Sequence, residues 1–578
     1  MDDDACLELL RKQCPEQEDE FLGKLAKLCG KIALAMCIAG SRVDDFENPD
    51  ELLQHLQEQP MNTLQCPESD QYIFRAINMS YEKCSSEEQE TFVRLAVFEG
   101  NFSADAARVV TEKKNLETTN MLKKLVRHSL IKQPIKHRYS IHLLIKHFLK
   151  HQQESESETA REQMMRAEWL MVKYYLKLGH DLTMKSYGKD KYKANRKALK
   201  QEAHNIQNVL KICCQQKDPT TSDISDCLAH SKVYTTSARF FSLFVRTILG
   251  SIVDEFLQRC ANLAEEREEH AIKLNFDCLL VDQQRNESIG ESDEHFNTKM
   301  EEIKKDFETH YEDLEENKSF CAHYYYQYGR YLSRKSEHHK GEESEERLEL
   351  QIQARKQLEK SFNLRKTLTD SSVEMADQVF SLLQLGHECK SISTTEYYLG
   401  KKDESKKSME NTKEYYREAI RLSKNDLGEH ELTSSCYKSL GDLFLTIKDP
   451  KEAEKWYTTA KEMRENLELD ASERHVFVLN NLGKCLTKSN RAKKATEVLE
   501  SARDMAEKLA GSDEPNKCKA KVYTTLAIAY HSIRSQRYSE NAVNYAKKAL
   551  EFGGLDEVIK KKEKEKLQEI LSSNLTNN

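Results

Sequence analysis

The sequence is poor in the residues that make tight turns. Glycine (18) and proline (8) together account for 26 of the 578 residues, whereas an average protein contains about 12% of the two. Strand-rich sandwiches and barrels are therefore excluded, because their turns usually need one of these residues. The apolar fraction is 38% and the charged fraction 32%, which is typical of amphipathic helices with narrow apolar stripes. We predict an all-α protein.

Membrane spans, targeting signals and metal-binding spacings are also missing. The longest apolar stretches, Cys29–Gly40 and Phe240–Val253, each contain a basic residue and are shorter than the ~20 residues of a membrane helix. The acidic start Met1–Asp4 fits neither a secretory signal nor a transit peptide. The sixteen cysteines include no Cys-x-x-Cys pair, so we expect free thiols, no metal centre and a cytoplasmic location.

Basic charge is concentrated in one segment. Residues 121–151 contain eight Lys or Arg and no acid, whereas residues 1–20 contain eight acids. Such a face can attract the phosphates of a nucleic acid, or it can dock onto an acidic surface of the protein. The docking interpretation is the one we favour, and both predict roles for Lys132, Lys136 and Arg138.

The first 227 residues are predicted to form three parts. Residues 1–60 carry helical apolar stripes, and residues 61–151 carry three more, followed by two alternating segments, Leu130–Gln133 and Arg138–Ile141, around Pro134. Three helices followed by a hairpin is the outline of a winged helix. Residues 152–227 are then predicted to be a helical connector.

An internal repeat occupies residues 228–555 and is clearest over 430–555. Leu440-Gly441 and the later Ala453, Tyr457 and Ala460 recur 42 residues further on, as Leu482-Gly483, Ala495, Leu499 and Ala502. Small residues at such spacing allow two helices of a hairpin to cross closely. In the weaker segment 373–427, either Leu385-Gly386 or Leu399-Gly400 can hold the crossing position. Residues 556–578 are predicted to be a charged helical tail.

This order of large and small positions resembles the tetratricopeptide repeat, and the run Ala453–Arg464 is similar to the kinesin light chain type. The resemblance implies a solenoid of helical hairpins whose groove binds a peptide or protein partner. The residues expected to face that groove are polar and could pair with a peptide backbone or with carboxylates: Lys438, Asn480, Asn481, Lys484, Lys521 and Thr524.

The first 210 residues resemble the rear part of the NB-ARC module of STAND-type signalling NTPases. The resemblance rests on four segments in the family's order: Leu28–Ala35, Phe92–Phe102, Arg138–Ile145 and Glu202–Ile206. It implies the regulatory or sensor half of a signal-transduction protein of the innate-immunity or apoptosis-regulation kind, acting as a scaffold.

The departures from that family are as informative. No Gly-x-x-x-x-Gly-Lys-Ser/Thr loop is present, so the chain is expected to begin behind the phosphate-binding part and to have no cofactor and no enzymatic activity. Of the family's residues that face the phosphate of a bound nucleotide, His142 alone is retained. The alternative is that His142 is a packing residue. Two alternatives remain open: part of a truncated ADP/ATP switch whose missing core would dock on 121–151, or a nucleic-acid-binding regulator.

Overall fold

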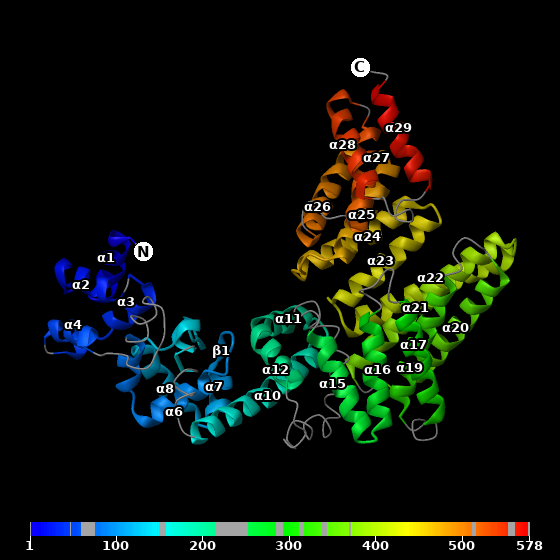
Figure 1. Ribbon diagram of the computed structural model, residues 1–578. Coiled ribbons are helices and arrows are strands. Elements are labelled where there is room, and N and C mark those ends of the chain that lie inside the picture. Colours follow the sequence, from blue (N-terminus) through cyan, green and yellow to red (C-terminus); the bar gives the residue numbers. More distant parts are fainter. Residues whose placement is uncertain are drawn as a thin grey trace. The chain divides into compact units, whose positions relative to one another are not determined.

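The computed structural model forms two compact units, which are described separately (Figure 1). It describes residues 2–58, 76–146, 148–149, 158–215, 252–284, 293–310, 317–337, 344–368, 371–510, 516–552 and 561–575, without the single positions 30, 47 and 534. Parts of the predicted domains, including 216–251, lie outside the described residues. Unit 1 comprises Met1–Leu182 and Ala198–Arg259, and unit 2 comprises Thr183–Lys197 and Cys260–Asn578.

Unit 1 begins with four short helices around a common core. They are α1 (Asp3–Gln13), α2 (Asp19–Leu28), α3 (Ala33–Gly40) and α4 (Pro49–Glu58). Asp2 begins α1 as its N-cap, since its carboxylate accepts a hydrogen bond from the Ala5 amide at 2.8 Å. The core between these helices is fully buried at Cys6, Leu10, Leu22, Leu25 and Leu52.

Three helices and a small sheet follow. The helices are α6 (Ser86–Leu95), α7 (Ala104–Thr111) and α8 (Asn115–Arg127), and the antiparallel sheet has the order β1 (Phe102–Ser103), β3 (Arg138–Ser140), β2 (Lys132–Ile135). The predicted hairpin is present as β2 and β3. Its first strand begins two residues later than predicted and contains Pro134, which an exposed edge strand tolerates. Strand β1 was not predicted.

The remaining helices of the first half are α10 (Glu158–Ser186), α11 (Tyr192–Gln201) and α12 (Ala203–Gln215). The last turn of α10 and the beginning of α11 belong to unit 2, because residues 183–197 contact its helices, whereas the rest of both helices belongs to unit 1. The predicted domain boundaries stay predictions.

Unit 2 is a succession of helical hairpins, as the repeat predicted (Figure 1). Helix α15 (Ile252–Glu266) belongs to unit 1 up to Arg259 and to unit 2 from Cys260. After its second half and the helices α16 (His270–Gln284) and α17 (Asp293–Thr309), each hairpin pairs two consecutive helices. The pairs are α19 (Lys318–Glu337) with α20 (Glu345–Lys366), α21 (Ser372–Tyr398) with α22 (Lys402–Asp426), α23 (Glu431–Thr446) with α24 (Pro450–Asn466), α25 (Glu473–Lys488) with α26 (Ala492–Ala510), and α27 (Lys517–Ser532) with α28 (Gln536–Phe552).

Glycine marks the point where the two helices of a hairpin cross. A Cβ atom on Gly329, Gly386 or Gly483 would stand less than 3.0 Å from a side chain of the second helix, and one on Gly441 would stand 3.0 Å from it. The opposing side chains are Leu358, Tyr416, Leu499 and Tyr457, respectively. Of the two glycines that the sequence left open, Gly386 therefore holds the crossing position, and Gly400, with φ of +81°, lies in the turn after α21.

A final helix, α29 (Lys561–Leu575), packs against the last hairpin. Its Leu567 and Ile570 are buried in the same core as Tyr523 and Leu526 of α27. The predicted charged tail is therefore charged on one side only, and its apolar side closes the stack.

Candidate peptide-binding site

Two consecutive hairpins bring four polar side chains together at Asp442, three from their first helices and one from a second helix. Lys438, one turn earlier on α23, places its ammonium 2.7 Å from the Asp442 carboxylate. Asn481 of α25 donates to the same carboxylate at 3.1 Å, and the Tyr457 hydroxyl of α24 donates to it as well. Burial disfavours the charged form of Asp442, but Lys438, the Tyr457 hydroxyl and the charge of Lys390 together outweigh this effect and hold its pKa below the ordinary value. The cluster thus combines a fixed charge pair with amide and hydroxyl groups.

Further polar contacts connect the two first helices of this cluster, α23 and α25, to other helices of unit 2. His387 of α21 lies 3.3 Å from the Ser439 hydroxyl of α23, measured from its Nε2. Lys484 of α25 places its ammonium 3.5 Å from the Glu563 carboxylate of α29. His387, Asp442 and Lys484 each directly follow a crossing glycine, so the repeat puts them at equivalent positions.

Four of the six predicted groove residues are partly exposed on these first helices: Lys438, Asn481, Lys484 and Lys521. Asn480 and Thr524 are a correction, since they are only 1% and 2% exposed. Lys438 holds the same offset from its crossing glycine as Asn480 and stays partly exposed, so this offset alone does not set burial. The Thr524 hydroxyl donates to the Ala520 carbonyl at 2.7 Å, within its own helix. The sequence analysis missed Asp442, although its place after Gly441 matches that of Lys484 after Gly483.

The basic segment 121–151 is partly used in packing. Arg138 pairs with the Glu202 carboxylate, and the exposed fractions of the two side chains are only 15% and 9%. Its guanidinium also donates to the Asn101 carbonyl at 2.8 Å. Arg138 therefore lies in the packing of unit 1 and not on an open basic face with Lys132 and Lys136, which are exposed.

The Glu-x-x-Asn run at 202–205 attaches α12 to the loop before β1. Asn205 accepts a hydrogen bond from the Gly100 amide at 3.0 Å and donates to the Asn101 carbonyl at 2.9 Å. The Asn205 amide also donates to the Tyr175 hydroxyl at 3.0 Å. Buried polar groups that satisfy one another in this way fix how the elements pack, so both residues of the run have structural roles.

His142 lies directly before a short helix. Its Nδ1 accepts a hydrogen bond from the Leu144 amide at 3.3 Å, and the side chain is exposed. Partial burial and the charge of Lys132 lower its pKa. Through this contact His142 caps the short helix. A role of His142 in binding a nucleotide phosphate stays a prediction.

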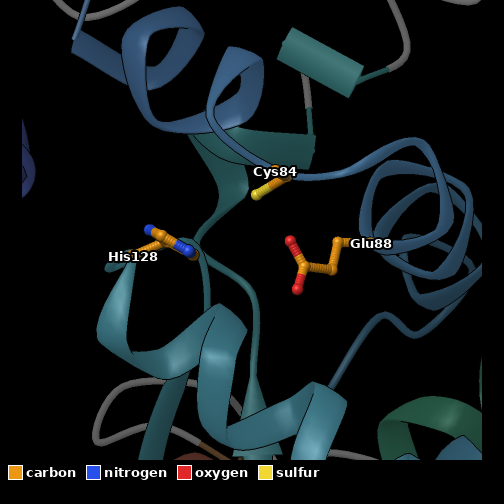
Figure 2. Close-up of side chains that lie close together, drawn as sticks. All are labelled: Cys84, Glu88 and His128. Carbon is orange, nitrogen blue, oxygen red and sulfur yellow. The ribbon is translucent and has the colours of Figure 1, made fainter.

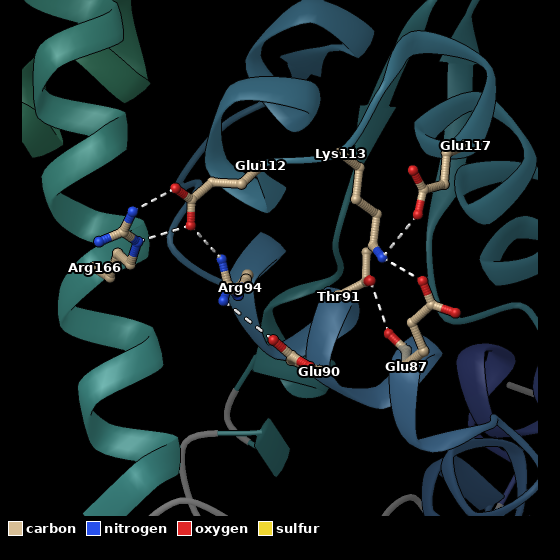
Figure 3. A network of polar contacts seen from close by, with 8 residues as sticks. All are labelled: Glu87, Glu90, Thr91, Arg94, Glu112, Lys113, Glu117 and Arg166. Atoms are coloured by element: carbon tan, nitrogen blue, oxygen red, sulfur yellow. Dashed lines mark hydrogen bonds and ion pairs between the residues drawn. The ribbon is translucent and has the colours of Figure 1, made fainter.

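Glu112, at the end of α7, connects this helix with two others of unit 1, α6 and α10 (Figure 3). It ends α7 with a left-handed φ of 56°, and its carboxylate accepts from Arg166 at 2.6 and 2.7 Å and from Arg94 at 3.1 Å. These two cations, Arg166 most strongly, lower the pKa of Glu112 to about 2. Because α6, α7 and α10 meet at this carboxylate, its role is to hold them together.

Three potential metal ligands come together between α6 and α8 (Figure 2). The ligand atoms of Cys84, Glu88 and His128 lie within 4.8 Å of one another. However, Glu88 already accepts from the Ser85 amide at 2.9 Å, as part of a capping box, and from the Lys124 ammonium at 2.7 Å. Burial raises the pKa of the Cys84 thiol to about 11. A neutral thiol and a neighbouring ammonium both oppose a cation, so we assign Glu88 to the cap.

Within the described residues, no helix is long and apolar enough to cross a membrane. Most of the apolar stretch Phe240–Val253 lies outside these residues.

Comparison with known proteins supports the repeat. Residues 392–466, which cover the end of α21 and all of α22, α23 and α24, match the family model of the tetratricopeptide repeat. No curated protein matches the chain in sequence. Unit 2 thus contains repeats of the tetratricopeptide type, which are protein-interaction scaffolds and typically not enzymes.

Among solved structures, three that match this chain do so at low sequence identity and low TM-score. A signal transduction ATPase with numerous domains and a tetratricopeptide repeat sensor, from Pyrococcus horikoshii, is 15% identical, with a TM-score of 0.39, covering 96% of this chain and 74% of that chain. A putative kinesin light chain from Podospora anserina is 12% identical, with a TM-score of 0.29 over 38% and 93%. A Rap protein complexed with competence and sporulation factor is 12% identical, with a TM-score of 0.36 over 70% and 98%.

Proposed function

We propose that the hairpins of unit 2 bind a peptide segment of a partner protein in the groove lined by their first helices. The observation that carries this proposal is the cluster of Lys438, Asp442 and Asn481, in which two consecutive first helices present charged and amide groups together. Amides of this kind hydrogen-bond an extended backbone, and Lys484 or Lys521 can pair with carboxylates of the partner.

We further propose that the protein is the regulatory half of a cytoplasmic signalling protein of the innate-immunity or apoptosis-regulation kind. The resemblance of residues 1–210 to the NB-ARC module supports this, as does a sheet and three helices in the arrangement expected for a winged helix. The docking interpretation of 121–151 is supported by the pairing of Arg138 with Glu202, an acid of the same chain.

A displayed library of random twelve-residue peptides, selected on the full chain, tests the groove. Asn481→Arg places a long cation at the centre of the cluster, so it should abolish binding of the selected peptides. Thr459→Arg is the matched control, because Thr459 lies partly exposed on the second helix, α24, where its hydroxyl bonds only within that helix, and it should leave binding unchanged. Selected peptides that bind Asn481→Arg as well as the original chain would overturn the proposal.

A further inference from the structure

A segment of the chain that precedes the hairpins is docked on their turns. Residues 183–197 belong to unit 2, and Asp190 makes the central contact. The Asp190 amide donates to the Leu427 carbonyl at 3.0 Å, and its carboxylate accepts from the Glu429 amide at 2.8 Å. Gly428 lies between these two contacts with φ of +65°, and a Cβ atom there would collide with the Asp190 carboxylate. The turn is therefore shaped to receive this residue.

Aromatic side chains on either side of Asp190 enclose a buried histidine. The ring centroids of Tyr192 and Tyr187 lie 4.3 and 5.1 Å from that of His430. The Tyr192 hydroxyl donates to the Glu431 carboxylate at 2.7 Å. Since His430 is 4% exposed and Tyr192 is 5% exposed, this is a desolvated contact of the kind that anchors bound peptides.

Basic residues of the segment reach the next turn of the stack. Arg196 places its guanidinium 2.7 Å from the Asp470 carboxylate, and Lys193 contacts the Asn466 carbonyl at 2.9 Å and the Glu468 carboxylate at 2.7 Å. The acidic partners are 50% and 71% exposed. The Arg196 side chain itself is only 8% exposed, whereas that of Lys193 is 45% exposed. The Lys193 pair is therefore an exposed ion pair, which contributes little and is screened by salt, so this part of the contact opens most readily.

The carboxylate that accepts from Tyr192 has a second partner within the hairpins, which it would keep if residues 187–196 left the surface. Glu431 lies 3.6 Å from the guanidinium of Arg464, which also donates to the Ser472 hydroxyl at 3.0 Å. Departure of Tyr192 would therefore not leave a buried unpaired carboxylate, which is the usual reason why such contacts cannot open.

We propose that the turns 427–431 and 466–470 form a second peptide-docking surface, separate from the groove, which residues 187–196 of this chain occupy reversibly. The surface selects an aspartate in a tight turn, a tyrosine two residues later and an arginine four residues after the tyrosine. Release of the segment would free this surface for a partner segment of the same chemistry.

The test uses the full chain and a fluorescein-labelled synthetic peptide of residues 183–200. In the double variant Asp190→Ala, Arg196→Glu, the chain's own segment is disabled, so the peptide should bind at least about tenfold more tightly than it binds the unaltered chain, as measured by fluorescence anisotropy. Adding Gly428→Ala should remove this binding. Gly400→Ala is the matched control, because Gly400 also has a positive φ but nothing lies within 4 Å of its added Cβ.

Two results would overturn the proposal. One is a folded double variant that does not bind the peptide, or that binds it equally well after Gly428→Ala has been added. The other comes from hydrogen exchange on the unaltered chain: if amides of 187–196 exchange only together with those of α23 and α25, the segment is a fixed part of the fold. Separate, faster exchange of 187–196 supports the proposal even where the double variant fails to fold.

Discussion

The ring of Tyr416 occupies the space that a Cβ atom of Gly386 would need. The nearest ring atom would lie well inside 3.0 Å of such a Cβ, and Tyr416 is fully buried. The backbone of α21 thus rests directly on an aromatic side chain of α22. Equivalent contacts in the neighbouring hairpins make this pair the basic unit of the stack.

Substitution of this glycine should destabilise unit 2. Gly386→Ala is expected to lower the free energy of unfolding by about 1–3 kcal/mol, because the surrounding core cannot yield without strain. Urea denaturation followed by circular dichroism measures the effect. Gly23→Ala in α2, where nothing lies within 4 Å of the added Cβ, should instead be neutral or stabilise by up to about 1 kcal/mol. Equal behaviour of the two variants would contradict the close crossing.

The pair of Arg138 and Glu202 predicts an asymmetric response to mutation within the basic segment. Arg138→Ala leaves the buried Glu202 carboxylate without its cation and should destabilise unit 1 by about 3–5 kcal/mol. Lys136→Ala, in the exposed turn between β2 and β3, should change stability by less than about 0.5 kcal/mol. Thermal denaturation distinguishes the two variants. If Arg138→Ala were as stable as the original chain, Arg138 would instead belong to an open basic face.

Glu112 predicts acid sensitivity of unit 1. Its pKa is lowered from 4.5 to about 2, so its stabilising effect is fully present above pH 4.5 and is lost as the pH falls from there toward 2. Because the side chain is 36% exposed, the effect should not exceed about 1 kcal/mol. Glu112→Gln should lower the urea midpoint at pH 6, and this difference should vanish near pH 2. Glu117→Gln controls for the loss of a nearby acid.

His430 predicts a second pH dependence, in unit 2. Burial lowers its pKa from 6.5 to about 4, so the unfolded chain takes up a proton first and stability falls as the pH drops from 6.5 toward 4. Between pH 7 and pH 5 the loss should be about 2 kcal/mol. His430→Asn retains a capping side chain and should flatten this slope in denaturation experiments. His475, whose pKa is also lowered to about 4, should preserve part of it. An unchanged slope would mean that His430 is not the source.

The sequence predicted the hairpins well because each crossing needs a small residue on one helix and bulky side chains on the other, at fixed spacing. It could not decide between Gly386 and Gly400, since both follow a leucine, and only the position of Tyr416 distinguishes them. Strand β1 was not predicted because two residues are too few to show the alternation of apolar and polar side chains.

Burial of single residues and contacts across long distances were harder to predict. Asn480 was counted as a groove residue from its distance to Gly483, although its side chain is buried. The contact of Tyr192 with Glu431 joins residues 239 positions apart, and no local pattern announces such a pairing. Asp442, in contrast, could have been found by applying the repeat offset consistently.

Helix α29 has a consequence for how copies of the chain meet. Its Leu567 and Ile570 cover the last hairpin, whose apolar side would otherwise resemble the surface on which the next repeat stacks. A chain cut after residue 552 would present that side to water, and copies would join end to end or aggregate. The closing helix therefore keeps this apolar side of the last hairpin out of water, and its removal should lower the solubility of the protein.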